Sequence, residues 1–590
     1  MKDKVLYHFY NNNFAISLQL CENAYNALND KDENAKKDQI FYLKYACLSV
    51  LKLDDKQKEL NYIAHFCQTN TSSFWLLNLA KAFAKNLKFN EAFALFEELL
   101  KRNDELNDNI KFEYALVLKQ AYEPLKAENL LASLIEKDSF NLELLALRAE
   151  LFFQNDPLKS LKLHEELVES AKKLIAHYLQ NGTQRLNQAP NTLQTRLTKE
   201  DENLEIENIE NYLNTKIYPQ IAFLYYKLRK LDKALELFAS LKESNDKNAA
   251  FWQNYAKALE YSTNYEEALN AYKKALSIHS HATYAFDMAY LLMRIARFKE
   301  GVLIYENRLF YAHQETFSPR HYQQSLDAFN KYGVKAFEGK EICVFCEQGY
   351  GDTIMYSRCL TKLCKIAKKV LFAPQSDLYL LFDKSFKAFQ KDGLYENLEV
   401  LSDIPKKFDY ALPICSLPLM CDIDIDEIKT LKTPIYNFKT NSAKKELKIG
   451  LFYLTPTAIH EDLQRNFKLS LILEALKDLP VKFASFQMQK PEQEPEFIED
   501  KTQNISSWLD TQNALQDIDL MISIDSAIAH LSLALNIPTI VLLYDYFDWR
   551  WGRFEEPKSY FWENANLVIF KEEKSFKKAL KARAKKLLSL

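Results

Sequence analysis

Glycine is almost missing from the first half of this chain, and that scarcity limits the folds open to it. The sequence has 590 residues and nine glycines, of which only Gly182 precedes residue 300. Prolines divide in the same way, with four before residue 300 and twelve after it. Because both residue types interrupt helices and build turns, a stretch of about 300 residues nearly free of them is predicted to be all-helical.

Within that stretch, a set of apolar and small residues recurs at a spacing of 34. One copy consists of Tyr218, Ile221, Ala222, Tyr225, Ala234, Phe238 and Leu241, and the next of Trp252, Tyr255, Ala256, Leu259, Ala268, Tyr272 and Ala275. Further copies start at Leu76, Ala115 and Ala289. The pattern resembles the tetratricopeptide repeat, in which small residues let two antiparallel helices touch, so a solenoid of helix pairs is predicted.

The second half of the chain has a different pattern. Runs such as KIGLF, LMISI and TIVLLY alternate with helix-like sequence, which is typical of parallel βα units. The predicted fold class is α plus α/β, a helical solenoid followed by two Rossmann-type lobes. The predicted layout is a repeat domain at 1–309 with a polar insertion at about 180–210, a linker at 310–337, a first lobe at 338–440 and a second lobe at 446–590.

Composition excludes several classes of protein. Lys and Arg number 77 against 80 Asp and Glu, a net charge of −3, so a nucleic-acid partner is not expected. Nine scattered cysteines form neither a disulfide framework nor a zinc pattern. The start MKDKVLYHFYNNN lacks the apolar run of a signal peptide, and polar residues interrupt the apolar region 518–546. A cytoplasmic protein with no transmembrane segment is therefore expected.

The first candidate site is the segment CEQGYGDTIMYSRCL, which follows the predicted strand EICVF and opens a helix. Gly349 and Gly351 permit a tight turn and a close backbone approach. Asp352 has two interpretations at this stage: with Thr353 it caps the new helix, or it acts as a base. The helix N-terminus itself offers free N–H groups to an anionic or polar ligand.

The second candidate site is the segment DLMISIDSAIAHLSLALNIPTIVLLY, in which a buried strand is predicted to end at Asp525 and Ser526. Asp525 and His530 lie five residues apart across a strand–helix turn, so both are expected to face the crevice where open α/β sheets bind ligands. Ser526 and the N–H groups that follow it suit a pyrophosphate. The alternative is that Asp525 caps the helix and His530 is an ordinary helix residue.

Two further segments carry basic and aromatic residues. In HEDLQRNFKL, Arg465 and Lys468 suit a phosphate, although basic loop residues are commonly just solvated. In DYFDWRWGRF, two tryptophans indicate stacking on a sugar or base, or anchoring between domains. The tail from Lys571 to Leu590 has eight Lys or Arg against two Glu. It is predicted to form an amphipathic helix that packs on the α/β half, with a membrane-surface role as the alternative.

The order of these segments resembles one family. A repeat ending in FKEGVLIYENRLF precedes EQGYGD, IGLF, ISIDSAIAHL and DWRWGR. This order is similar to that of bacterial tetratricopeptide proteins whose C-terminal half is a family 9, heptosyltransferase-like glycosyltransferase with the GT-B fold. The resemblance covers roughly residues 215–570, and the layout is also similar to that of flagellin and other protein O-glycosyltransferases.

The resemblance implies a metal-independent, inverting transfer from a nucleotide-activated sugar, with no cofactor. It implies that Asp352 is the catalytic base. The donor site that it implies consists of Arg465, Lys468, Asp525, Ser526 and His530. The residues expected near the sugar or the acceptor are Glu347, Gln348, Gly349, Gly351, His460, Trp549 and Arg550.

The leading hypothesis is a protein glycosyltransferase. The solenoid would hold a polypeptide acceptor, with flagellin as one candidate, and the GT-B half would transfer the sugar to Ser or Thr. One alternative is a lipid- or oligosaccharide-directed transferase of envelope glycan synthesis, with weak peripheral membrane contact through the basic tail. The other is a non-catalytic adaptor whose GT-B half is degenerate.

Overall fold

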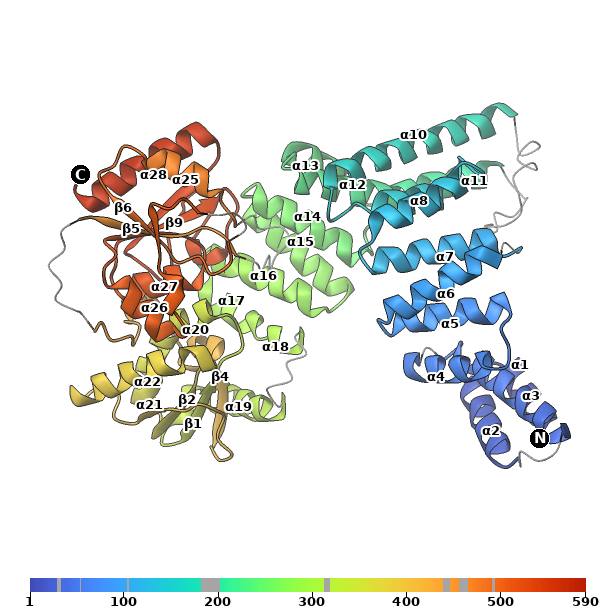
Figure 1. Cartoon of the computed structure of the whole chain (residues 1–590), viewed down its shortest axis with the longest axis horizontal. Coiled ribbons are helices and arrows are strands. Elements are labelled where there is room, and N and C mark those ends of the chain that lie inside the picture. The colour runs from blue at the N-terminus through green and yellow to red at the C-terminus, as the bar shows by residue number, and fades with distance from the viewer. Residues whose placement is uncertain are drawn as a thin grey trace. The chain divides into compact units, whose positions relative to one another are not determined.

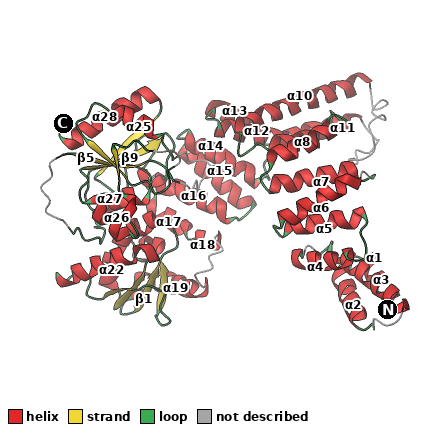
Figure 2. Cartoon of the chain, in the orientation of Figure 1, coloured by secondary structure: helices red, strands yellow, loops and turns green. Residues whose placement is uncertain are grey.

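The computed structural model describes residues 1–28, 33–53, 55–102, 105–181, 202–311, 319–438, 446–455, 465–490 and 494–590 (Figure 1). It divides into two compact units, Met1–Asn245 and Asp246–Leu590. Within the described ranges, the first unit is helical and both sheets belong to the second (Figure 2). The predicted fold class is confirmed: a helical-repeat region precedes two α/β lobes with parallel sheets.

The first unit is a succession of antiparallel helices. They are α1 (Lys2–Tyr10), α2 (Phe14–Asn26), α3 (Glu33–Val50), α4 (Lys56–Cys67), α5 (Ser73–Lys85), α6 (Phe89–Arg102), α7 (Asn107–Gln120), α8 (Pro124–Ile135), α9 (Leu142–Glu150), α10 (Pro157–Asn181), α11 (Glu202–Tyr212), the π-helical turn η2 (Leu213–Ile217), α12 (Tyr218–Lys227) and α13 (Leu231–Ser240).

Small residues lie where the paired helices meet, as the repeat pattern predicts. Ala80 on α5 and Ala92 on α6 are fully buried, and so are Ala115 on α7 and Ala127 on α8. The turns inside the pairs share a second feature, an exposed residue with left-handed backbone and a φ between 58° and 64°. These residues are Leu87, Tyr122, Arg229, Thr263 and Ala296.

Two segments expected to be loop or linker contain helix in the parts that the structure describes. The insertion predicted at about 180–210 begins inside α10, and α11 starts at Glu202; residues 182–201 lie outside the described ranges. Ile209 is buried there, which explains why that part of the polar segment orders as a helix. The predicted linker at 310–337 contains helix α19 (Pro319–Tyr332) and the 3-10 turn η3 (Gly333–Phe337).

The second unit starts with more helix pairs and continues into the two lobes. The helices are α14 (Ala249–Tyr261), α15 (Tyr265–Ile278), α16 (Ala282–Arg294), α17 (Phe298–Tyr305) and α18 (Arg308–Tyr311). The first lobe, after α19, contains β1 (Glu341–Phe345), α20 (Tyr350–Tyr356), η4 (Ser357–Cys359), α21 (Leu360–Ile366), β2 (Lys369–Ala373), α22 (Ser376–Lys391), β3 (Leu398–Val400), β4 (Tyr410–Pro413), η5 (Ile414–Ser416), α23 (Leu417–Met420) and α24 (Ile425–Thr430).

The second lobe repeats the same architecture with a larger sheet. It contains β5 (Lys448–Phe452), α25 (Leu469–Leu476), β6 (Lys482–Ser485), β7 (Ile498–Asp500), η6 (Thr502–Asn504), α26 (Trp508–Leu515), β8 (Leu520–Ile524), α27 (Ala527–Ala534), β9 (Thr539–Tyr544), η7 (Trp549–Trp551), β10 (Ala565–Phe570) and α28 (Glu573–Leu588).

Both sheets are parallel, and their strand orders determine where a ligand fits. The orders are β3-β2-β1-β4 and β10-β9-β8-β5-β6-β7. In register, Phe345 of β1 lies opposite Ala373 and Pro413, and β8 pairs with β5 and β9. The order reverses between β1 and β4 in the first sheet and between β8 and β5 in the second. Ligands bind beyond the carboxyl ends of strands at such reversals.

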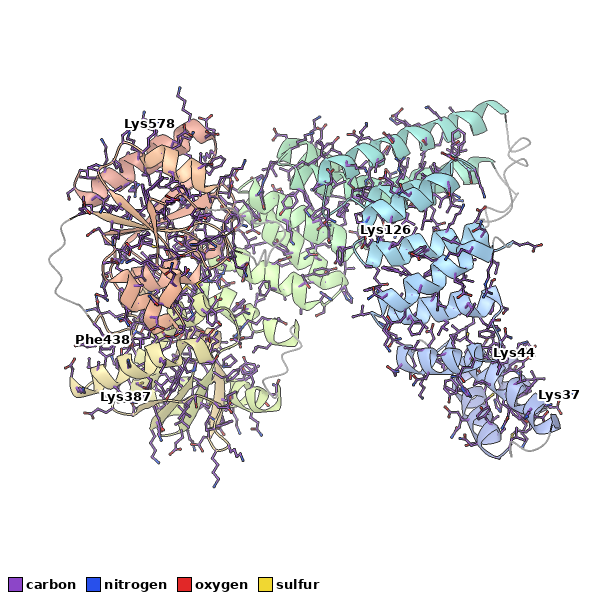
Figure 3. All side chains as sticks on the ribbon, in the orientation of Figure 1. Lys37, Lys44, Lys126, Lys387, Phe438 and Lys578 are labelled. Atoms are coloured by element: carbon purple, nitrogen blue, oxygen red, sulfur yellow. The ribbon has the colours of Figure 1, made fainter. Side chains whose placement is uncertain are left out.

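The C-terminal helix packs on the second lobe, as its amphipathic pattern predicts. Its buried residues Phe576, Leu580, Ala584 and Leu588 recur every four residues. Lys577 pairs with Glu474 at 2.5 Å, whereas the side chain of Lys578 points away from the ribbon (Figure 3). The apolar stripe of α28 is therefore buried against the lobe. The membrane-surface alternative needed this stripe to be exposed. In the described ranges, no helix has both the length and the apolar character to cross a membrane.

Candidate functional site

A cleft of about 580 Å³ lies where the two strand-order reversals face each other. The segment Gln348–Asp352, which follows β1, lines it from the first lobe. The second lobe contributes Thr455 after β5, Phe486–Gln489 after β6 and Asp525–Ile528 after β8. Most of the residues predicted to form a site therefore meet in one cavity, although they come from segments about 180 residues apart.

Asp352 belongs to the first turn of α20 and faces the second lobe. The residue that caps α20 is Gly349, with no side-chain cap bond, so the predicted capping by Asp352 and Thr353 is wrong. Thr353 instead donates a hydrogen bond to Gln375, at 2.8 Å. Oδ1 of Asp352 accepts a hydrogen bond from Nη2 of Arg550 at 2.5 Å. The carboxylate is therefore held across the cleft by a cation of the other lobe.

The two glycines of this segment have different effects. Neither has the positive φ that favours glycine, so the predicted tight turn does not depend on left-handed backbone. Gly351 matters for packing, because a Cβ there would lie 2.9 Å from Cδ2 of His530. A Cβ on Gly349 would be 3.6 Å from Oδ2 of Asp352, an ordinary contact. Gly351 therefore lets α20 approach α27 closely.

The turn after β8 places Asp525, Ser526 and His530 as the sequence predicts. β8 ends at Ile524, Ser526 is the N-cap of α27, and His530 is buried on the second turn of that helix. Nε2 of His530 lies 3.8 Å from Oδ1 of Asp525. Nδ1 of His530 accepts a hydrogen bond from Nε1 of Trp562 at 2.8 Å, and the ring of Trp551 stacks on the imidazole at 5.5 Å.

These contacts determine the protonation state of His530. Burial lowers the pKa of the imidazole to about 3, so the side chain is neutral at physiological pH. An indole N–H only donates, which makes Nδ1 the acceptor and leaves the proton on Nε2. His530 therefore offers an N–H donor on the side of Asp525 and cannot serve as a base through that nitrogen.

The carboxylates of the second lobe are balanced by arginine. Burial raises the pKa of Asp525, although the positive charge of Arg465 partly offsets it. Burial also opposes ionisation of Asp548, but Arg550 outweighs it and lowers the pKa of that carboxyl. Nη1 of Arg550 donates to Asp548 at 2.9 Å. Arg550 therefore bridges Asp548 of its own loop and Asp352 of the opposite lobe.

The predicted basic loop contributes one residue to the cleft. Arg465 lines it beside Asp525 and Asp548. Lys468 is exposed at the N-cap of α25 and does not line the cleft, so its predicted contact with the donor has no support in the described geometry. His460 lies outside the described ranges.

Glu347, predicted to lie near the sugar, points into the protein interior instead. Its side chain has no exposed surface and pairs with Arg308 of α18, with contacts of 2.6 and 2.9 Å. The backbone N–H of Cys415 donates to the same carboxylate at 3.3 Å. The next residue, Gln348, does line the cleft. Glu347 therefore anchors the loop that leads into α20, the helix that carries Asp352.

Trp549 is also a correction, because it is buried and does not line the cleft. Its ring packs on Tyr290 at 6.3 Å and Phe298 at 6.1 Å, which belong to helices α16 and α17. The predicted stacking on a sugar is therefore wrong for Trp549, and the other interpretation, anchoring between parts of the chain, describes its contacts.

Three residues important to the site were not among those predicted. Tyr290 lines the cleft from a helix of the repeat region, next to the repeat position Ala289, and no motif marks it. Trp562 lies in a segment with no motif. Asp548 lies inside DYFDWRWGRF. Its position close to Arg550 and Arg553 in the sequence could have indicated a charged site. Among the described residues, no three His, Cys, Asp or Glu side chains are grouped to hold a metal ion.

No protein-family model matches the chain, and no curated protein matches its sequence. Solved structures match parts of it. A tetratricopeptide repeat protein from Parabacteroides merdae is 14% identical over 49% of this chain and 96% of its own length, with a TM-score of 0.36. The iron-containing dodecameric glycosyltransferase TibC from enterotoxigenic E. coli is 11% identical over 43% and 76%, with a TM-score of 0.29. A family 9 glycosyl transferase from Veillonella parvula is 9% identical over 42% and 90%, with a TM-score of 0.25. At these values the likenesses do not assign the chain to a family.

Proposed function

We propose that this protein is a glycosyltransferase that moves a sugar from a nucleotide-sugar donor to Ser or Thr hydroxyls of a protein. One observation carries the proposal: two parallel-sheet lobes direct their strand ends into one cleft, with a carboxylate on one side and an arginine and a helix N-terminus on the other. Asp352 comes from the first lobe, and Arg465 and Ser526 come from the second.

The second lobe would hold the donor. The N-terminus of α27 presents free N–H groups at Ser526, and such a terminus attracts phosphate. Arg465 adds a positive charge, and Nε2–H of His530 adds a neutral donor. Together these groups would stabilise the negative charge that collects on the departing diphosphate. In this proposal the protein side chains supply that stabilisation, and neither a metal ion nor a cofactor is required.

The transfer itself would invert the sugar. The acceptor oxygen attacks the anomeric carbon, the bond from that carbon to the diphosphate oxygen breaks, and the diphosphate leaves with the electron pair. Asp352 takes the hydroxyl proton. Its Oδ1 is bonded to Arg550, whereas Oδ2 lies beside Gly349, so Oδ2 is the oxygen proposed to act as the base.

A polypeptide acceptor fits the helical-repeat region better than a small molecule does. The first unit contains a groove of about 640 Å³ between α10, α12 and α13. Tyr218 and Tyr225 line it together with charged side chains such as Glu169 and Lys233, a mixture suited to an extended peptide. Flagellin is the first acceptor to test, because the motif order resembles that of flagellin glycosyltransferases.

Calorimetric binding tests the donor site directly. Purified protein would be titrated with UDP, GDP, ADP, CMP and their sugar conjugates. We expect micromolar binding of one nucleotide, lost in Arg465→Ala and Asp525→Ala and retained in Lys468→Ala, a matched basic residue outside the cleft. Intact-protein mass of candidate acceptors would then report transfer, which Asp352→Ala should abolish while nucleotide binding persists. No binding across the whole panel would overturn the proposal.

One observation favours a second candidate, a non-catalytic adaptor. Asp352 is engaged by Arg550 at 2.5 Å, so one of its two carboxylate oxygens is already occupied by a protein partner. Under the adaptor hypothesis, Asp352→Ala and Arg465→Ala leave the cellular phenotype intact, whereas substitutions in the repeat groove abolish it. The glycosyltransferase hypothesis predicts that the two site variants lose the phenotype.

A further inference from the structure

The cleft includes a side chain from the helical-repeat region. Tyr290 lies on α16, which pairs with α17 in the last copy of the repeat, yet it lines the cleft together with Asp352, Asp548 and Arg550. In Figure 1, α16 lies in the second unit, close to the two lobes. Packing between the repeat helices does not require a hydroxyl at this position. The neighbours of the Tyr290 side chain therefore indicate the role of its hydroxyl.

The Tyr290 ring is held by other aromatic residues. Ring centroids lie 4.4 Å away at Phe286, 5.9 Å at Tyr305 and 6.3 Å at Trp549. Burial raises the pKa of Tyr290, with the charge of Arg550 acting in the opposite direction, so the hydroxyl stays protonated at neutral pH. Arg550 lines the same cleft, and the ring of Trp549 packs against both side chains, 6.3 Å from the Tyr290 ring and 5.1 Å from the guanidinium carbon of Arg550.

The backbone around Tyr290 is fixed to the second lobe one helical turn further on. Arg294, also on α16, is buried and donates to the carbonyl of Phe547 at 2.9 Å and to that of Gly552 at 3.0 Å. The carbonyl of Arg294 accepts a hydrogen bond from the hydroxyl of Tyr560 at 2.5 Å. Since these partners flank Arg550 in the chain, α16 and the arginine are positioned together.

We propose that Tyr290 is a positioning residue of the transfer reaction, which holds the Arg550 guanidinium between Asp548 and Asp352 and so orients the base. This inference rests on the proposed function. Nη2 of Arg550 donates to Asp352 and Nη1 donates to Asp548. In this proposal the hydroxyl of Tyr290, which lines the cleft with Arg550, is the third group that restrains rotation of the guanidinium. The last repeat is then part of the active site and more than a support for the acceptor.

The test compares two tyrosines of one aromatic cluster in the full-length protein. Tyr290→Phe removes the hydroxyl proposed to restrain Arg550, whereas Tyr305→Phe removes a buried hydroxyl with no hydrogen-bond partner among the described residues. We expect Tyr290→Phe to lower kcat about 10-fold or more, the usual effect of losing a hydrogen bond to a charged group. Donor KM and nucleotide affinity should stay at wild-type values, and Tm should fall only slightly, because the substitution removes one buried polar contact. Tyr305→Phe should behave as wild type in every measurement.

A double-mutant cycle separates positioning through Arg550 from a direct effect. Arg550→Lys keeps the charge and loses the fork, so Tyr290→Phe should have little further effect in that background. Full additivity of the two losses would overturn the inference, as would an unchanged kcat in Tyr290→Phe or an equal loss in Tyr305→Phe. In each of these outcomes the wild type transfers sugar, which leaves the proposed function standing. A wild type that transfers no sugar from any donor overturns the proposed function, and this inference with it.

Discussion

At the scale of single residues, His530 shows how burial selects one chemical form. The imidazole is enclosed by Trp551 and Trp562, and burial lowers its pKa to about 3. Because the pKa in the folded protein lies below the unfolded value of about 6.5, the unfolded chain takes up the proton first as the pH falls. The stability that neutral His530 contributes is complete above about pH 7 and is lost as the pH drops below 6.5 toward 3.

We therefore expect part of the acid sensitivity of the second unit to come from this residue. Lowering the pH from 7 to 5 should cost the wild type roughly 2 kcal/mol more than it costs His530→Gln, which has no group that titrates there. Urea unfolding followed by tryptophan fluorescence measures this difference, since five of the six tryptophans lie after residue 245. Equal losses in the two proteins would show that burial of His530 does not govern the effect.

At the scale of helices, the repeat turns are built without glycine, and this has a cost. Thr263 is exposed between α14 and α15 and has a φ of 63°, a conformation that strains a β-branched residue. Thr263→Gly should raise the free energy of unfolding by roughly 0.5–1 kcal/mol, because relief of the strain exceeds the entropy lost by glycine. Thr283→Gly, inside α16, is the control and should lower it. Thermal unfolding of both variants decides, and a lower Tm for Thr263→Gly would contradict the prediction.

Contact between the two lobes depends on one buried cation, Arg358 of the first lobe. Arg358 donates to the carbonyls of Ile428 at 3.2 Å and Phe561 at 2.6 Å, and the ring of Trp562 lies 4.3 Å from its guanidinium. Burial lowers its pKa to about 10, so it stays charged at neutral pH. Arg358→Met leaves two buried carbonyls without donors and should cost roughly 2–4 kcal/mol. Arg297→Met, which removes an exposed pair with Glu300, should change Tm little. Equal effects in the two variants would contradict this role.

Secondary-structure elements could be predicted from the sequence, whereas the long-range partners of individual side chains could not. The strands at Glu341–Phe345 and Leu520–Ile524 could be predicted, since runs of β-branched and apolar residues determine strands locally. The close approach at Gly351 also followed from its lack of a side chain. The environment of Glu347 could not be predicted, because its partner Arg308 stands 39 residues away on another helix. Tyr290 was missed for the same reason, since its partner Arg550 is 260 positions further along the chain.

At the scale of the whole molecule, the repeats and the lobes are not separate parts after residue 245. The second unit joins α14–α18 to both lobes. Arg294 bonds to the loop that carries Arg550, and Arg308 bonds to Glu347 in the loop that leads into α20 and Asp352. Both arginines are buried, with 3% of their surface exposed. Since each cleft loop is held by a helix of the repeat region, the cleft should depend on those helices for its shape.

This dependence predicts different behaviour for two fragments. A fragment that starts at Asp246 keeps both arginines and should fold and bind the nucleotide with the affinity of the full chain. A fragment that starts at residue 310 leaves Glu347 buried without Arg308, a loss of roughly 3–5 kcal/mol, and also exposes the face of Trp549 that packs on α16 and α17. It should be aggregated or partly unfolded and should bind no nucleotide. Circular dichroism, gel filtration and calorimetry distinguish the two outcomes. A folded monomer from residue 310 with full affinity would show that the lobes shape the cleft without the repeats.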